Sequence, residues 1–214
     1  MIISRVMTKN PIFVHPEMSI NDVRALMDKQ KIGHLPVLDK SNALVGLMTK
    51  KDLLKAGPSS ATSLDMYEIS YLLSKMTVKD VMVKKVITVG ETEVVEEAAR
   101  IMADNDIGCL PVLRDNLLVG IITDTDLFHV FLKAFGVRHP GVRVTCLMRE
   151  KPGELARVAQ AMAEKGGNIV ALVTSEGEDP SRRRVTIKVS GVKMSDVKSI
   201  LNTFDGIELE DIRE

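Results

Sequence analysis

The strongest constraint on this chain is an internal repeat. The letters LPVL at positions 35–38 recur at 110–113, and LVG at 44–46 recurs at 118–120 after the loss of one residue. The register between the two copies holds over about 50 residues, which is longer than chance matching of apolar letters produces. We therefore expect two similar structural units that pack together around a pseudo-twofold axis, because one copy alone buries little core.

Each copy predicts the element order strand, helix, strand, strand, helix. Ile12–Val14 and Ile87–Val89 are short β-rich runs that would open the units. Ser19 and Asp22 have the spacing of a capping box at a helix start. The apolar runs at 35–38 and 44–48 predict a hairpin, and an amphipathic stretch between the copies predicts a connecting helix.

The candidate chemistry follows the hairpin. The pattern Gly-apolar-x-Thr-x-x-Asp occurs at 46–52 and again at 120–126. A strand that ends at the threonine, with a helix starting at once, leaves free backbone N–H groups that favour an anion. The glycine admits a close backbone approach, and the aspartate lies one turn away, where it can accept from two adjacent hydroxyls. Thr-x-x-Asp is also an ordinary capping box, so a purely structural interpretation stays open.

This repeat resembles the tandem CBS (cystathionine β-synthase) domain pair over roughly residues 1–136. The resemblance implies an α+β fold with a first motif at 1–62, a connecting helix at 63–76 and a second motif at 77–136. It also implies clefts for AMP, ADP, ATP or S-adenosylmethionine, bound as regulatory ligands and not as cofactors. By the family's layout the nucleotide-binding residues are Thr49, Asp52, Thr123, Asp126, Ile12, Pro36, Ile87 and Pro111. We add Lys50 and Asp124, because each stands directly after a signature threonine.

Two pairs of equivalent positions differ between the copies. Lys50 stands where the second copy has Asp124, so the first cleft should tolerate more phosphate charge than the second. His34 and Cys109 are also equivalent, each just before Leu-Pro, and fit either a cleft wall or ordinary core filling.

Beyond a linker at 137–141, residues 142–214 predict the order βαββαβ, a ferredoxin-like split unit. Its strands Val142–Leu147 and Asn168–Thr174 carry apolar residues that we assign to both faces, which would leave one face for a second chain. The second helix should run over Ser195–Phe204 from a serine cap. Arg182, Arg183 and Arg184 are expected in a solvated loop or a partner contact.

The third unit contains the sequence Lys-Pro-Gly-Glu-Leu at 151–155 and Gly-Asn-Ile at 167–169. Together with the element order, these motifs resemble an ACT domain, an amino-acid-sensing regulatory module. The resemblance rests on the turn before the first helix and on the start of the second strand. It implies an effector site between paired subunits, bordered by Pro152, Gly153, Glu154, Leu155, Asn168 and Ile169. ACT domains also serve as dimerisation platforms alone, and that alternative stays open.

Composition excludes several other classes of protein. Lys+Arg and Asp+Glu are both 29 and aromatic residues are 3% with no Trp, so we expect no nucleic-acid partner. Cys109 and Cys146 are the only cysteines and the four histidines are scattered, so we expect no metal site. No apolar run reaches a membrane span and the first ten residues lack a signal-peptide core, which predicts a cytoplasmic protein without a membrane partner.

The whole arrangement, a CBS pair followed directly by an ACT domain, resembles the acetoin-utilisation protein B family. It implies a regulatory protein and not an enzyme, a nucleotide sensor acting on an unknown partner protein. Two alternatives remain: a constitutive scaffold with empty clefts, and a small nucleotide hydrolase using Asp52, Asp124 or Asp126. We expect a twofold homodimer held through both the CBS and ACT regions.

Overall fold

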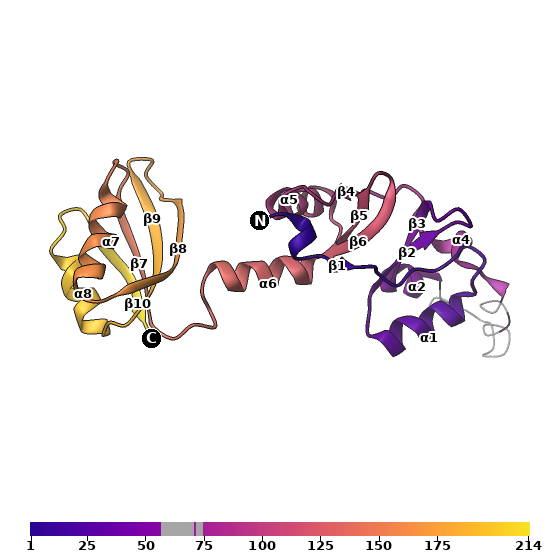
Figure 1. Cartoon of the computed structure of the whole chain (residues 1–214), viewed down its shortest axis with the longest axis horizontal. Helices are drawn as coiled ribbons and strands as arrows, with labels where there is room; N and C mark the ends of the chain where they lie inside the picture. The colour runs from indigo at the N-terminus through magenta and orange to yellow at the C-terminus, as the bar shows by residue number, and fades with distance from the viewer. Residues whose placement is uncertain (57–70, 72–74) are drawn as a thin grey trace. The chain divides into compact units, whose positions relative to one another are not determined.

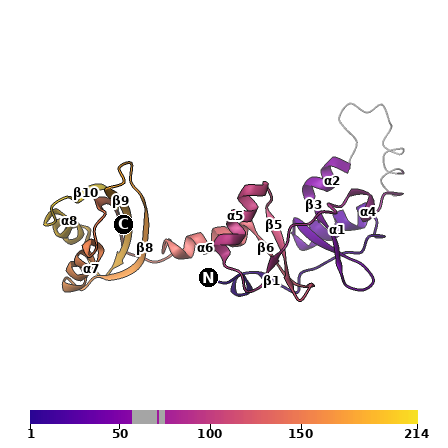
Figure 2. The same cartoon turned by 90° about the horizontal axis from the view of Figure 1, so that it is seen from above.

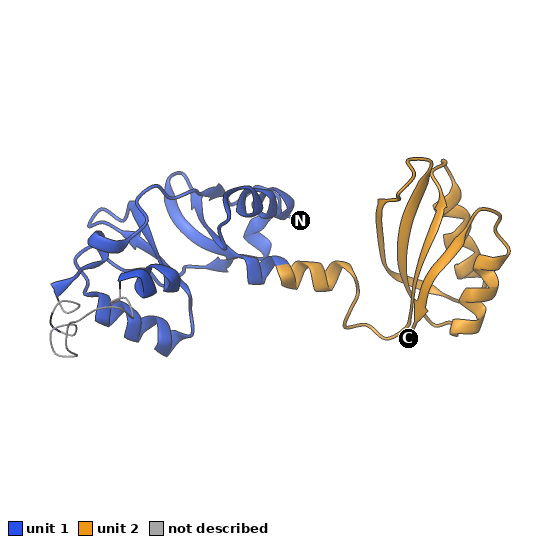
Figure 3. Ribbon diagram, turned by 180° about the vertical axis from the view of Figure 1, so that it is seen from behind, with its two compact units in different colours: residues 1–127 blue, residues 128–214 orange. Residues whose placement is uncertain are grey.

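The computed structural model describes residues 1–56, 71 and 75–214 of the chain. These residues form two compact units, Met1–Leu127 and Phe128–Glu214, which Figures 1 and 3 show. The connecting helix expected over residues 63–76 falls almost entirely outside the described residues. In the part of the chain that is described, no helix is both long enough and apolar enough to cross a membrane.

The first repeat contains the predicted helix, hairpin and helix. Its elements are α1 (Ile20–Gln30), β2 (His34–Leu38), β3 (Leu44–Thr49) and α2 (Lys50–Ala56). The Ser19 Oγ accepts a hydrogen bond from the Asp22 backbone N–H at 3.1 Å, which confirms the expected cap of α1. The two hairpin strands pair antiparallel, and α2 follows β3 without a loop.

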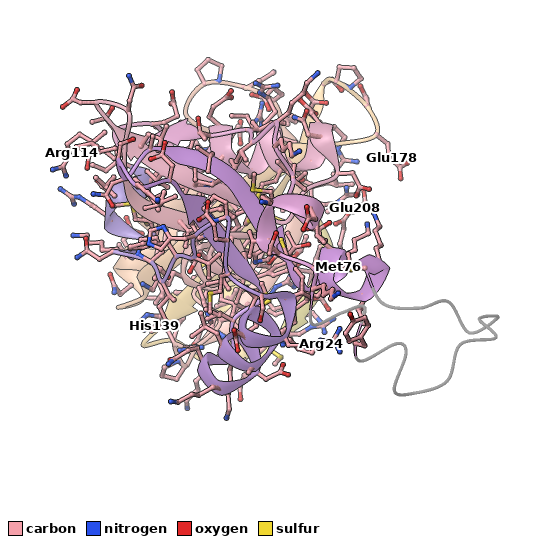
Figure 4. The ribbon with its side chains drawn as sticks, turned by 90° about the vertical axis from the view of Figure 1, so that its right-hand side faces the viewer. Arg24, Met76, Arg114, His139, Glu178 and Glu208 are labelled. Carbon is pink, nitrogen blue, oxygen red and sulfur yellow. The ribbon has the colours of Figure 1, made fainter. Side chains whose placement is uncertain are left out.

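The second repeat has the same order. Its elements are β4 (Val89–Gly90), α5 (Val95–Asn105), β5 (Cys109–Arg114), β6 (Leu117–Thr123) and α6 (Asp124–Ala134). At the end of β5, Arg114 projects from the surface (Figure 4), and its Nη2 donates to Glu91 Oε2 at 2.6 Å. This ion pair ties β5 to the residue that follows β4.

The opening strands are shorter than predicted. The run Ile12–Val14 makes a single parallel bridge, between Val14 and Val37, and the run Ile87–Val89 contributes only its last residue to β4. Pro11 and Pro16 flank the first run and lack the backbone N–H that a longer ladder needs. Both runs nevertheless lie beside the first strand of their own hairpin, as the repeat predicts.

The segment ahead of each repeat packs on the other repeat. The 3₁₀-helix η1 (Ile3–Arg5) hydrogen-bonds to the carbonyls of Glu91 and Glu93. Strand β1 (Thr8–Lys9) pairs with β6, and Figures 1 and 2 show the two strands side by side. In return, α4 (Val78–Val81) hydrogen-bonds to the loop before α1 and adds Val78 to the core of the first repeat. The two repeats are therefore joined by an exchange of their first segments.

The C-terminal unit confirms the predicted βαββαβ order. Its elements are β7 (Val142–Arg149), α7 (Glu154–Glu164), β8 (Asn168–Glu176), β9 (Arg182–Ser190), α8 (Met194–Asn202) and β10 (Glu208–Arg213). The strands form an antiparallel sheet in the order β10-β7-β9-β8, and both helices cover one face of it (Figures 1 and 2). Helix α8 is capped at Lys193 and not at Ser195, because Met194 already has helical backbone geometry; the expected serine cap is wrong.

Our assignment of apolar residues to both faces of β7 is also wrong. Val142, Val144 and Cys146 share the face beneath the helices and are buried in one core. Since side chains alternate along a strand, the other face carries Arg143, Thr145 and part-buried Leu147. The uncovered face of this part of the sheet is therefore largely polar.

The three consecutive arginines are not in a loop. They open β9, where each forms an ion pair with an acidic residue of another segment. Arg182 pairs with Glu208 at 2.9 Å, Arg184 pairs with Glu210 at 2.8 Å, and Arg183 pairs with Glu150. Because the fold brings acidic side chains beside them, the three arginines form ion pairs within their own domain. They are not a free basic patch.

Candidate functional site

The signature threonines and aspartates form the same hydrogen-bonded cap in both repeats. Thr49 donates its backbone N–H to Asp52 Oδ2 at 3.0 Å and its hydroxyl to the same oxygen at 2.6 Å. Thr123 and Asp126 repeat this arrangement at 2.9 and 2.8 Å. The capping interpretation of Thr-x-x-Asp is therefore confirmed in both copies.

The cap occupies only one oxygen of each carboxylate. Among the described residues, neither Asp52 Oδ1 nor Asp126 Oδ1 has a hydrogen-bond partner in the protein. An ionised carboxylate accepts hydrogen bonds through both oxygens. Capping and ligand binding are thus compatible on the same side chain.

Each cap lines one of two clefts. The first cleft, of about 490 Å³, includes Thr49 and Asp52 together with Ile87 from the segment before the second repeat's helix. The second cleft, of about 480 Å³, includes Thr123 and Asp126 together with Ile12. Each cleft therefore combines a cap from one repeat with an isoleucine from the other.

The remaining predicted nucleotide-binding residues divide into two groups. Lys50 lines the first cleft and Asp124 lines the second, at the start of α2 and of α6. Pro36 and Pro111 are buried within β2 and β5 and line neither cleft. They support the hairpins from which the caps project.

Sequence reasoning missed several residues that line the clefts. The first cleft also contains Lys51, Lys55, Lys85 and Asp106, and the second also contains Asn10 and Lys31. A signal for two of them was present, because Lys85 and Asn10 each stand two residues before the isoleucine already singled out. Gly33 and His34 line both clefts.

The signature glycines serve a different purpose from the one expected. A β-carbon at Gly46 would overlap Met82 Sδ, and one at Gly120 would overlap Met7 Sδ. Neither glycine lines a cleft. The missing side chains make room for a methionine of the exchanged segment and not for a ligand.

Burial shifts the titration of two residues near the clefts. It lowers the pKa of the His34 imidazole, an effect that the nearby Asp124 and Asp52 carboxylates oppose. Burial also raises the pKa of the Cys109 thiol to about 12, and the same two carboxylates add to this rise. Cys109 is therefore a neutral thiol at pH 7, which suits a buried wall residue and not a nucleophile.

The residues expected to border an amino-acid site lie at opposite ends of the C-terminal sheet. Gly153, with φ 89°, caps α7 just after β7, at the end where Arg149 pairs with Arg182. Asn168 starts β8 at the other end, where it pairs with Ser190. The first group holds Pro152, Gly153, Glu154 and Leu155, and the second holds Asn168 and Ile169. A strand of eight residues spans about 26 Å, so one chain does not bring the two groups together.

Two repeats with exchanged segments and two equivalent clefts, followed by a four-stranded βαββαβ unit, define the class of tandem CBS-pair proteins with a C-terminal ACT domain. The family comparison agrees with this fold. The CBS domain family matches residues 3–59 and 78–133, and the TTHA0829-like ACT domain matches residues 140–213. The chain belongs to the CBS-domain family and carries a TTHA0829-like ACT domain.

Similar curated proteins include enzymes that share the CBS region. An L-aspartate semialdehyde sulfurtransferase from Methanocaldococcus jannaschii is 30% identical over 131 residues, which are 61% of this chain and 23% of that enzyme. An inosine-5'-monophosphate dehydrogenase from Korarchaeum cryptofilum is 34% identical over 131 residues, 61% of this chain and 24% of that enzyme. The chain thus spans about a quarter of the length of these two relatives.

Solved structures with the same fold include ligand complexes. The CBS domain pair of protein MJ0100, in complex with 5'-methylthioadenosine and S-adenosyl-L-methionine, is 29% identical with a TM-score of 0.53 and covers 65% of this chain and 98% of its own. CBSX2 in complex with AMP is 28% identical with a TM-score of 0.51, covering 64% and 98%. A putative acetoin utilization protein from Vibrio cholerae is 29% identical with a TM-score of 0.54, covering 65% and 98%.

Proposed function

We propose that this chain is a regulatory protein that binds adenosine compounds in its two clefts. The observation that carries the proposal is the pair of capping aspartates, Asp52 and Asp126. Each lines a cleft and has one carboxylate oxygen with no hydrogen-bond partner among the described residues. The vicinal hydroxyls of a ribose would donate to that oxygen. Ile12 and Ile87 offer apolar surface for a purine ring, and the cleft volumes lie within the usual range for small-molecule sites.

Proteins similar to this chain support the choice of ligand class. AMP, S-adenosylmethionine and 5'-methylthioadenosine share an adenosine group, and they occur with CBS proteins that are 28 and 29% identical to this chain. We propose adenine nucleotides or S-adenosylmethionine as the ligands. They act as regulatory ligands and not as cofactors of a reaction.

A ligand in either cleft would contact both repeats, because each cleft draws a cap from one repeat and an isoleucine from the other. Binding then favours the arrangement of the repeats that closes on the ligand. Such a ligand shifts the equilibrium only by its difference in affinity for the two arrangements, typically about 1–3 kcal/mol. The ACT domain or a partner protein would respond to that change in the equilibrium.

The ACT domain would pair with that of a second chain. In our proposal this pairing also forms any amino-acid site, since one chain holds Gly153 and Asn168 at opposite ends of the sheet. The likeness to the putative acetoin utilization protein supports a regulatory role in acetoin use. The rival functions are a scaffold with empty clefts and a nucleotide hydrolase.

Thermal unfolding with adenosine, AMP, ADP, ATP and S-adenosylmethionine tests the proposal. A ligand at a hundredfold excess over its Kd should stabilise the folded chain by about 2.7 kcal/mol. A panel that leaves the melting temperature unchanged would favour the scaffold. Release of inorganic phosphate during incubation with ATP would favour the hydrolase.

A matched set of variants separates ligand binding from capping. Asp52→Ala, Asp126→Ala and Asp80→Ala each remove the carboxylate that accepts from a capping threonine, and each should cost about 1 kcal/mol of stability. Asp80 is the control, because it lines neither cleft. Its Oδ2 accepts from the Thr77 backbone N–H at 2.9 Å and from the Thr77 hydroxyl at 2.7 Å, as in the two clefts. Only the first two variants should weaken the ligand-induced stabilisation. An equal ligand-induced stabilisation in all three variants would contradict ribose binding by Asp52 and Asp126.

A further inference from the structure

The two clefts occupy equivalent places in the repeats but carry different charges. At three equivalent positions the first cleft has a lysine where the second has an acidic or a neutral residue: Lys50 against Asp124, Lys51 against Thr125, and Lys85 against Asn10. These are differences of side-chain charge at the same points of one backbone framework.

The first cleft is cationic. Among the described residues, its lining contains four lysines and two aspartates, namely Lys50, Lys51, Lys55, Lys85, Asp52 and Asp106. The Lys50 Nζ lies 3.5 Å from Asp28 Oδ1, and both side chains are more than half exposed. An ion pair so open to water is weak, so a phosphate group can take the place of Asp28. Lysines are common phosphate ligands.

The second cleft is anionic. In the described part of the chain, its lining contains two aspartates, Asp124 and Asp126, and one lysine, Lys31. Asp124 Oδ1 accepts a hydrogen bond from the Thr125 backbone N–H at 2.6 Å, which holds this carboxylate at the start of α6. A phosphate in this cleft would meet like charge from both aspartates, and that repulsion opposes binding.

We propose that the two clefts sort adenosine compounds by charge: the first takes a phosphorylated one, and the second takes one that has no phosphate. This inference rests on the proposed function, since it assumes that both clefts bind adenosine. The second ligand is a neutral nucleoside or a cation such as a sulfonium adenosine. The protein would then respond to two different metabolite classes at once.

Isothermal titration of the full chain with ATP and with adenosine tests this sorting. The wild-type chain should bind one ATP, and Lys50→Asp with Lys51→Thr should weaken that site by about tenfold or more while adenosine still binds. Asp124→Lys with Thr125→Lys copies the first cleft's lysines into the second and should raise the stoichiometry to two ATP per chain.

A control variant separates local from global charge. Asp104→Lys with Asn105→Lys changes the net charge by the same amount at exposed positions of α5 outside both clefts. It should leave the stoichiometry at one ATP. Circular dichroism melting shows whether each variant is folded. If the Asp124→Lys/Thr125→Lys variant is not folded, Asp124→Asn replaces it. The second cleft of Asp124→Asn should then gain measurable affinity for AMP.

The outcomes distinguish this inference from the function on which it rests. Three results would each overturn charge sorting and leave adenosine binding intact. They are two ATP bound per wild-type chain, unchanged ATP binding in the Lys50→Asp/Lys51→Thr variant, and one ATP bound by a folded Asp124→Lys/Thr125→Lys variant. A wild-type chain that binds neither ATP nor adenosine would overturn both.

Discussion

At the scale of single residues, His34 is the side chain that the two clefts share. Its ring is partly buried, and burial lowers its pKa against the opposing effect of Asp124 and Asp52. The sequence left its role open, because Cys109 stands at the equivalent position and both residues fit an ordinary core. The asymmetry between a titratable imidazole and a neutral thiol is visible only once both have been placed in the fold.

We predict that His34 makes the folded chain less stable in mild acid. Below the ordinary histidine pKa of about 6.5, the unfolded chain binds a proton that the folded chain resists, so stability is lost as the pH falls through this range. Urea unfolding at pH 7.5 and 5.5 should give a larger decrease for the wild type than for His34→Gln. His129→Gln, at an exposed position of α6, is the matched control. A larger decrease in the stability of His34→Gln than of the wild type would mean that the Asp124 and Asp52 carboxylates affect the His34 pKa more than burial does.

At the scale of elements, local patterns predicted the helices and hairpins well. Residues close together in the sequence determine the Ser19 cap, the hairpin around residues 39–42 and the βαββαβ order. The exchange of first segments between the repeats is a tertiary arrangement, and nothing in the periodicity of either copy specifies it. The same limit explains Gly46. Its pattern indicates a close approach by another group, but it does not show that this group is the Met82 side chain and not a ligand.

The exchange predicts that the N-terminus stabilises the second repeat. Ile3 is 0% exposed, while its neighbour Ile2 is 37% exposed. Ile3→Ala should therefore cost about 2–5 kcal/mol, and Ile2→Ala should stay within about 0.5 kcal/mol. Urea unfolding measures both values, and hydrogen exchange should show reduced protection of β6 in Ile3→Ala. Equal costs for the two variants would contradict the packing of η1 against the second repeat.

At the scale of the whole molecule, the positions of the strands change where a dimer contact is expected. The largely polar uncovered face of β7 no longer supports it. The edge of the sheet does, because β8 is an outer strand of nine residues with the apolar side chains Ile169, Val170, Leu172 and Val173. The other outer strand, β10, carries several charged residues instead, and charged edges resist strand pairing.

We predict a homodimer of the full chain that pairs through β8. Light scattering should give the mass of two 23.6-kDa chains. Leu172, at 40% exposure on this edge, should tolerate Leu172→Lys in the fold, but the new charge should block pairing and give a monomer. Leu117→Lys, at 57% exposure on β6, is the matched control and should remain a dimer. A monomeric wild type would contradict the dimer itself, and a dimeric Leu172→Lys would contradict the β8 edge and place the contact elsewhere on the chain.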